Sequence, residues 1–152
     1  MLAPSMSQNG LQGLRRFVKS IEDWKSSFDE QGDQGLSYLK SLYGYIEEYG
    51  TGGALFRNLY CDFLQELTCL PELREGSRAW RREELQQLES NLPTLRKAAS
   101  LWTELAGSIK AAVESEANSA IGLLDHEGLQ NIGKEIFLLE ESFWQSLKGL
   151  KP

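Results

Sequence analysis

Apolar residues recur at intervals of three and four along nearly the whole chain, with polar residues between them. This spacing gathers apolar side chains on one face of an α-helix. The first such stripe comprises Leu11, Leu14, Val18, Ile21 and Trp24. It predicts a helix over residues 10–28. The polar segment 29–33, which contains a glycine, is expected to end that helix.

Two further stripes follow in the first half of the chain. The second helix is predicted to end at Gly50, because glycine readily takes the left-handed conformation that closes a helix. A third helix is expected directly after Gly53. Its apolar stripe is the widest in the chain, and we therefore expect this helix to be the most buried one. The two stripes are Leu36, Leu39, Leu42, Tyr43 and Ile46, and then Leu55, Phe56, Leu59, Tyr60, Phe63, Leu64 and Leu67.

The second half of the chain predicts three more helices. A short fourth helix is indicated around Leu85 and Leu88, and Asn91-Leu92-Pro93 is expected to break it, with Pro93 in the first turn of a fifth helix that runs to about residue 118. The last helix is expected to begin near Asp125. Alternating apolar runs longer than about four residues are missing, so strands are not predicted.

These patterns predict an all-α bundle of five or six helices in a single domain, residues 1–152. Within it we expect an N-terminal helix pair over 10–49, a Gly-rich turn over 50–53 and C-terminal helices over 54–149.

Composition narrows the classes of function. The chain has 152 residues, of which 41% are hydrophobic, and its 16 Lys and Arg against 22 Asp and Glu give a formal charge of -6. A nucleic-acid-binding role is not expected, because such binding needs a concentration of Lys and Arg. No run approaches the roughly 18 apolar residues of a membrane span. We expect a cytoplasmic protein.

The cysteines and the single histidine offer little chemistry. Cys61 and Cys69 would lie about 12 Å apart along a helix, which is too far for a disulfide. An enzyme using Cys61 with His126 is one hypothesis, but Cys61 lies within an amphipathic stripe beside Asp62 and is expected to be a small packing residue. With one histidine, a di-iron centre built on Glu-x-x-His pairs is not expected. No catalytic residue, metal site or cofactor is therefore predicted.

The Gly-rich turn is the sharpest local feature. Gly50, Thr51, Gly52 and Gly53 precede a helix whose first N–H groups are free, and Arg57 lies one turn inside it. Such an arrangement can bind a phosphate or carboxylate. The alternative is a corner between two helices, with Arg57 paired to Glu47 or Glu48.

The residues around this turn resemble the C-terminal half of the butirosin-biosynthesis acyltransferase family. The resemblance rests on Ile46-Glu47, Tyr49 to Arg57, Tyr60, Phe63-Leu64 and Glu66, preceded by Gly10-Leu11, Gly13-Leu14-Arg15, Phe17 and Trp24. Gly50, Thr51, Gly52, Gly53 and Arg57 match the family's motif, whereas Ala54 replaces a glycine often found there. The resemblance implies a helical half that packs on a papain-like half, whose Cys and His pass an acyl group from a carrier protein to an amine.

The resemblance gives the leading expectation for function. The chain is expected to be a non-catalytic helical accessory domain that docks on a separate Cys–His catalytic domain, either as a fragment or as a split subunit. The alternative is a stand-alone helical protein that binds a small molecule or an anion. A papain-like catalytic domain or a second copy of the chain is the expected partner, and an acyl carrier protein is a further candidate.

Overall fold

The computed structural model describes residues 10–29, 33–49, 53–70, 81–115 and 124–148. These segments are helical and contain no strand, which confirms the all-α prediction. The helices are α1 (Gly10–Ser20), α2 (Trp24–Asp29), α3 (Asp33–Glu47), α4 (Ala54–Cys69), α5 (Arg82–Glu114) and α6 (His126–Ser146), and a 3₁₀ turn, η2 (Ile21–Asp23), joins α1 to α2.

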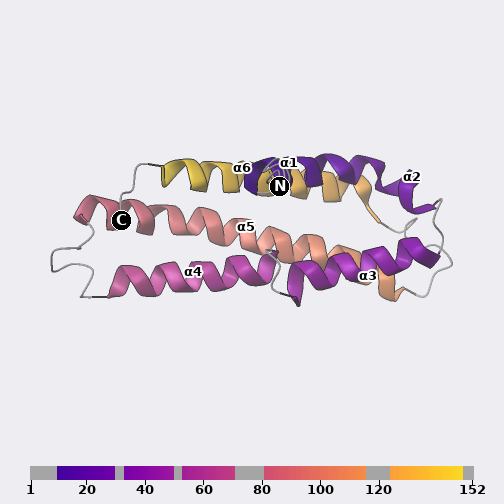
Figure 1. Cartoon of the computed structure of the whole chain (residues 1–152), viewed down its shortest axis with the longest axis horizontal. Helices are drawn as coiled ribbons and strands as arrows, with labels where there is room; N and C mark the ends of the chain where they lie inside the picture. Colours follow the sequence, from indigo (N-terminus) through magenta and orange to yellow (C-terminus); the bar gives the residue numbers. More distant parts are fainter. Residues whose placement is uncertain (1–9, 30–32, 50–52, 71–80, 116–123, 149–152) are drawn as a thin grey trace, which may run out of the picture.

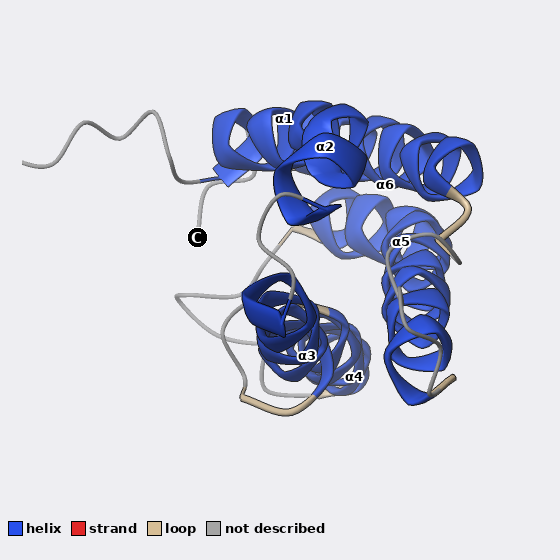
Figure 2. Cartoon of the chain, turned by 90° about the vertical axis from the view of Figure 1, so that its right-hand side faces the viewer, coloured by secondary structure: helices blue, strands red, loops and turns tan. Residues whose placement is uncertain are grey.

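Helix α5 is the centre of the molecule. At 1.5 Å per residue its 33 residues extend about 50 Å, and α3, α4 and α6 all pack on it. Figure 1 shows α3 and α4 end to end along one side of α5, and α6 antiparallel to it on the other side, with α1 beside α6. In Figure 2 the row formed by α3 and α4 and the row formed by α1 and α6 lie on different sides of α5.

The most buried helix is therefore α5, and the expectation for the helix after Gly53 was wrong. Helix α4 buries only one side, at Ala54, Cys61, Leu64 and Thr68. Phe56, Leu59 and Phe63 lie on its exposed side. The wide stripe in the sequence thus combined a face that contacts α5 with a face that contacts solvent.

The core consists of two hydrophobic clusters along α5. The first gathers α1, α3, the C-terminal half of α5 and the N-terminal half of α6; its fully buried members include Ile21, Leu39, Leu105, Ile109 and Ile136. The second gathers α4 and the opposite ends of α5 and α6, with Cys61, Leu64, Leu88, Leu92, Leu95 and Phe143. Helices α4, α5 and α6 each contribute to both clusters.

Helix α5 is continuous through Pro93, which corrects the predicted break at 91–93. Leu88, Leu92 and Leu95 keep helical spacing across the proline and are all buried in one cluster. Pro93 itself is exposed. Burial of the leucines offsets the lost backbone hydrogen bond, and the helix ends at Glu114 rather than near residue 118.

Two other boundaries show how side chains set local structure. The predicted helix over 10–28 is interrupted at η2, after Ser20, whose hydroxyl donates to the Phe17 carbonyl at 2.7 Å; such bonds compete with the helical ladder. The predicted start of the last helix is confirmed, because the Asp125 side chain accepts from the Gly128 N–H at 2.9 Å and caps α6.

Candidate functional site

Arg57 lies in the first helical turns of α4 and pairs with Glu140 of α6. Its Nε donates to Glu140 Oε1, and its Nη2 donates to Glu140 Oε2 at 2.8 Å. The third group, Nη1, donates to the Gly53 carbonyl at 3.1 Å. The two side chains form a bidentate pair, which is the strongest ion-pair geometry available to arginine.

Trp102 of α5 completes this arrangement. Its indole Nε1 donates to Glu140 Oε1 at 2.9 Å, and its ring lies 4.9 Å from the Arg57 guanidinium carbon. The side chains of Arg57 and Glu140 are only 17% and 5% exposed. We call Arg57, Trp102 and Glu140 the buried triad. It joins α4, α5 and α6 at one point.

The buried triad lies between the two hydrophobic clusters. On α6, Glu140 follows Ile136 of the first cluster by one turn and precedes Phe143 of the second. On α5, the fully buried Ala98 and Ala99 occupy the stretch between Leu95 and Trp102. The charged pair is thus surrounded by apolar side chains. In such surroundings a fully hydrogen-bonded ion pair is tolerated, but the loss of one partner lowers the stability of the fold strongly.

The suggested pairing of Arg57 with Glu47 or Glu48 was wrong. Glu140 is 83 residues away in sequence, and only the antiparallel packing of the helices brings it to Arg57. One signal was available: Glu140 interrupts the apolar stripe of α6 between Ile136 and Phe143, where a carboxylate must find a partner.

The Gly-rich turn is only partly described, since Gly50, Thr51 and Gly52 lie outside the described residues. Gly53 is buried at the start of α4, and a Cβ there would collide with the backbone of Ile46. This glycine therefore permits α3 and α4 to meet end to end. Binding of an external anion at Arg57 stays a prediction, and Glu140 already accepts from the Nε and Nη2 groups of this guanidinium.

Cys61 and His126 are not brought together. Cys61 is fully buried beside Phe143 in the second cluster, whereas His126 begins α6, about 25 Å away along that helix. Burial raises the pKa of the Cys61 thiol, and Arg96 only partly opposes this effect. The thiol is protonated at neutral pH and is a poor nucleophile. This geometry does not support the Cys61–His126 enzyme, and it confirms Cys61 as a packing residue.

Sequence reasoning missed an exposed apolar surface on α4. Phe56, Leu59 and Phe63 are 54%, 59% and 53% exposed. Tyr60 stacks on Phe63 and on Trp144 of α6, with ring centroids 6.2 and 5.9 Å apart. At these spacings the α4 residues share one side of the helix. We call Phe56, Leu59, Tyr60, Phe63 and Trp144 the α4 apolar face.

Within the described segments, no group of three His, Cys, Asp or Glu side chains could hold a metal ion. None of the helices in those segments combines the length and apolarity needed to cross a bilayer.

Comparison with known proteins gives one assignment. Neither the curated proteins nor the solved structures include a match to this chain. A family profile, described as "Domain of unknown function (DUF4872)", matches residues 1–147, which is nearly the whole chain. The chain therefore belongs to the DUF4872 family.

Proposed function

We propose that this chain is a non-catalytic accessory domain that docks on a separate papain-like Cys–His domain. The α4 apolar face carries this proposal. It presents two phenylalanines, a leucine, a tyrosine and a tryptophan on adjoining surfaces of α4 and α6. Isolated exposed apolar side chains are common, but a contiguous group rich in aromatic rings is typical of an interaction surface.

The surroundings of the face have the composition of a protein interface. Asn58, Asp62 and Glu66 are exposed beside it on α4 and would form a polar rim. Aromatic side chains near the centre of an interface commonly supply most of the binding free energy, while the rim excludes water. A helix that presents such a stripe suits a complementary groove on the partner.

The partner's identity rests on the resemblance around residues 46–66. In the acyltransferases that this segment resembles, a helical half packs on a Cys–His half. The buried thiol of Cys61 and its separation from His126 support a non-catalytic role for the chain itself. In this proposal the buried triad fixes α4 against α6, so that the aromatic residues of both helices form one surface.

The decisive experiment measures docking directly. The chain is titrated with a papain-like domain of a butirosin-type acyltransferase, preferably one encoded beside it, and the Kd is measured by calorimetry. The variant Leu59→Lys/Phe63→Lys is expected to weaken the complex by about thirtyfold or more, because two central apolar residues that contribute at least about 1 kcal/mol each together account for about 2 kcal/mol.

A matched control separates this face from general surface hydrophobicity. Leu138 of α6 is 62% exposed and lies outside the α4 apolar face. Leu138→Lys is expected to leave the Kd unchanged within about threefold, as for a residue outside an interface. The proposal fails if wild type forms no complex, or if Leu138→Lys weakens it as much as the double variant does.

A further inference from the structure

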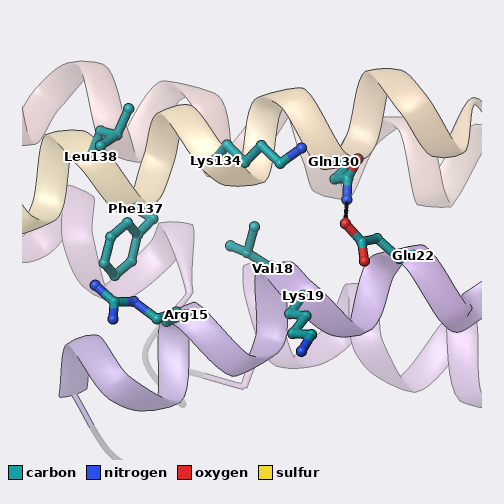
Figure 3. Close-up of a pocket in the computed structure, with 8 residues that line it drawn as sticks. All are labelled: Arg15, Val18, Lys19, Glu22, Gln130, Lys134, Phe137 and Leu138. Atoms are coloured by element: carbon teal, nitrogen blue, oxygen red, sulfur yellow. Dashed lines mark hydrogen bonds between the residues drawn. The ribbon is translucent and has the colours of Figure 1, made fainter.

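A second surface feature lies on the other side of the molecule, in a groove between α1 and α6. The groove encloses about 470 Å³ and is lined by Arg15, Val18, Lys19, Glu22, Gln130, Lys134, Phe137 and Leu138. This volume falls within the range of about 300–1,000 Å³ that is typical of small-molecule sites. Arg15, Val18 and Lys19 lie on α1 and Glu22 on η2, whereas the other lining residues lie on α6 (Figure 3).

The floor and the ends of the groove are built by defined contacts. Val18 is 6% exposed and lies at the floor. At one end Glu22 accepts a hydrogen bond from Gln130, and at the other the Arg15 guanidinium lies 4.9 Å from the Phe137 ring centroid (Figure 3). Gly133 permits the close approach of the helices, since a Cβ there would lie 3.3 Å from Val18 Cγ2.

The groove is cationic, although the chain as a whole carries a charge of -6. Lys19 lies on α1 and Lys134 on α6, and neither forms an ion pair with any described residue. Arg15 Nη2 lies 3.8 Å from Glu141 Oε1, and because the Arg15 side chain is 71% exposed this ion pair is weak. Glu22 is the single carboxylate of the lining, and Gln130 already binds it. Three cations therefore belong to the lining, with Arg15 over Phe137 at one end and the Lys19 side chain extending away from α6 (Figure 3).

We propose that this groove binds a small amphipathic anion, namely a carboxylate with a medium-length apolar tail. The tail would lie along Val18, Phe137 and Leu138, and the carboxylate would contact Lys134, with the flexible Lys19 side chain turning toward the groove to meet it. Each buried methylene of the tail raises the affinity roughly fourfold. The two lysines then select the head group, because they favour an anion over a neutral or cationic group.

Calorimetric titration of the full chain with octanoate tests both parts of the proposal. Octan-1-ol and octylammonium serve as probes with the same tail and a neutral or positive head. Two partly exposed ion contacts are together worth roughly tenfold in affinity. Octanoate is therefore expected to bind about tenfold more tightly than octan-1-ol, and octylammonium more weakly still. Butanoate is expected to bind more weakly than octanoate by the loss of four methylenes.

Variants locate the site. Lys19→Gln/Lys134→Gln is expected to weaken octanoate binding roughly tenfold while leaving octan-1-ol binding unchanged. Lys40→Gln/Lys97→Gln removes the same charge from exposed lysines on α3 and α5 and is expected to change neither. Leu138→Gln is expected to weaken the binding of both ligands, and because Leu138 is exposed the substitution should leave the fold intact.

Several results would overturn the proposal. These are an absence of octanoate binding at low-millimolar concentration, equal affinity for all three head groups, or equal effects of the two double-lysine variants. Inorganic phosphate binding as tightly as octanoate would also overturn it, because the apolar floor would then contribute nothing. The lysines lie outside the α4 apolar face, so the docking experiment and this one fail independently.

Discussion

At the scale of single residues, the buried triad is the most consequential arrangement in this molecule. Arg57 was singled out by the sequence as a candidate for anion binding, and the anion that contacts it is the chain's own Glu140. A carboxylate with 5% exposure is tolerated because the guanidinium and the Trp102 indole satisfy its oxygens. The same residues that could bind a ligand thus hold three helices together.

Removing one partner of the Arg57–Glu140 ion pair should destabilise the fold strongly. Glu140→Leu leaves the Arg57 charge buried without a counter-ion and is expected to lower the free energy of unfolding by about 3–5 kcal/mol. The double variant Arg57→Met/Glu140→Leu is expected to recover most of that loss, because apolar side chains of similar volume can replace a buried pair. Urea unfolding followed by circular dichroism measures both.

An exposed ion pair provides the control. Lys97 and Glu135 also join α5 to α6, but their side chains are 60% and 46% exposed. Glu135→Leu is expected to cost no more than about 1 kcal/mol. If Glu140→Leu were as mild as Glu135→Leu, the buried triad would not have the structural role assigned to it.

At the scale of the elements, α5 shows how packing overrides a local signal. A proline after Asn91-Leu92 is a reasonable sign of a helix boundary, since proline removes a backbone donor and clashes with the preceding turn. Helical spacing continues through it, however, from Leu88 to Leu95. The tertiary contacts of these leucines with α4 and α6 decide in favour of one long helix.

Replacing Pro93 tests this continuity. In an uninterrupted helix, Pro93→Ala restores the hydrogen bond to the Glu89 carbonyl and relieves the clash, so we expect a gain of about 1–3 kcal/mol in the free energy of unfolding. In the first turn of a separate helix, the same substitution would be neutral or slightly destabilising. Thermal and urea unfolding of the variant distinguish the two cases, and a loss of stability would contradict the continuous helix.

Helix α4 shows a related limit of sequence patterns. Periodicity reports that Phe56, Leu59 and Phe63 are apolar and lie on one side of a helix, but not what covers that side. The neighbours of α4 are decided by the path of the whole chain. In this fold they cover the side that carries Cys61 and Leu64 and leave the α4 apolar face exposed.

At the scale of the whole molecule, the two hydrophobic clusters are expected to unfold together. Helices α4, α5 and α6 pass through both, and the buried triad joins them at their boundary. Neither cluster can lose its helices without exposing part of the other. The protein should therefore behave as one cooperative unit, as small single domains usually do.

Large-to-small substitutions in each cluster test this cooperativity. Leu88 and Ile109 are 1% and 0% exposed and belong to the second and first cluster, respectively. Leu88→Ala and Ile109→Ala are each expected to cost about 2–5 kcal/mol and to shift a single transition. Circular dichroism and tryptophan fluorescence should give the same midpoint in each variant. Separate transitions by the two probes would show that the clusters unfold independently.

The sequence by itself determined the helices and most of their boundaries. The stripes from Leu11 to Trp24 and from Leu36 to Ile46, the glycine before α4 and the cap at Asp125 all act through neighbours a few residues away. Such local interactions can be recognised from spacing and residue type alone. The burial of Cys61 also followed from its place within an apolar stripe.

Only the tertiary structure decided which helix is central, which carboxylate pairs with Arg57 and which apolar surface stays exposed. Each depends on residues far apart in sequence, such as Arg57 with Glu140, or Val18 with Phe137 across the groove. Spacing along the chain fixes the face of a helix on which a residue lies, but it carries no information about the helix opposite. The packing of α4 and α6 on α5 supplies that information, and with it both surfaces for which we propose functions.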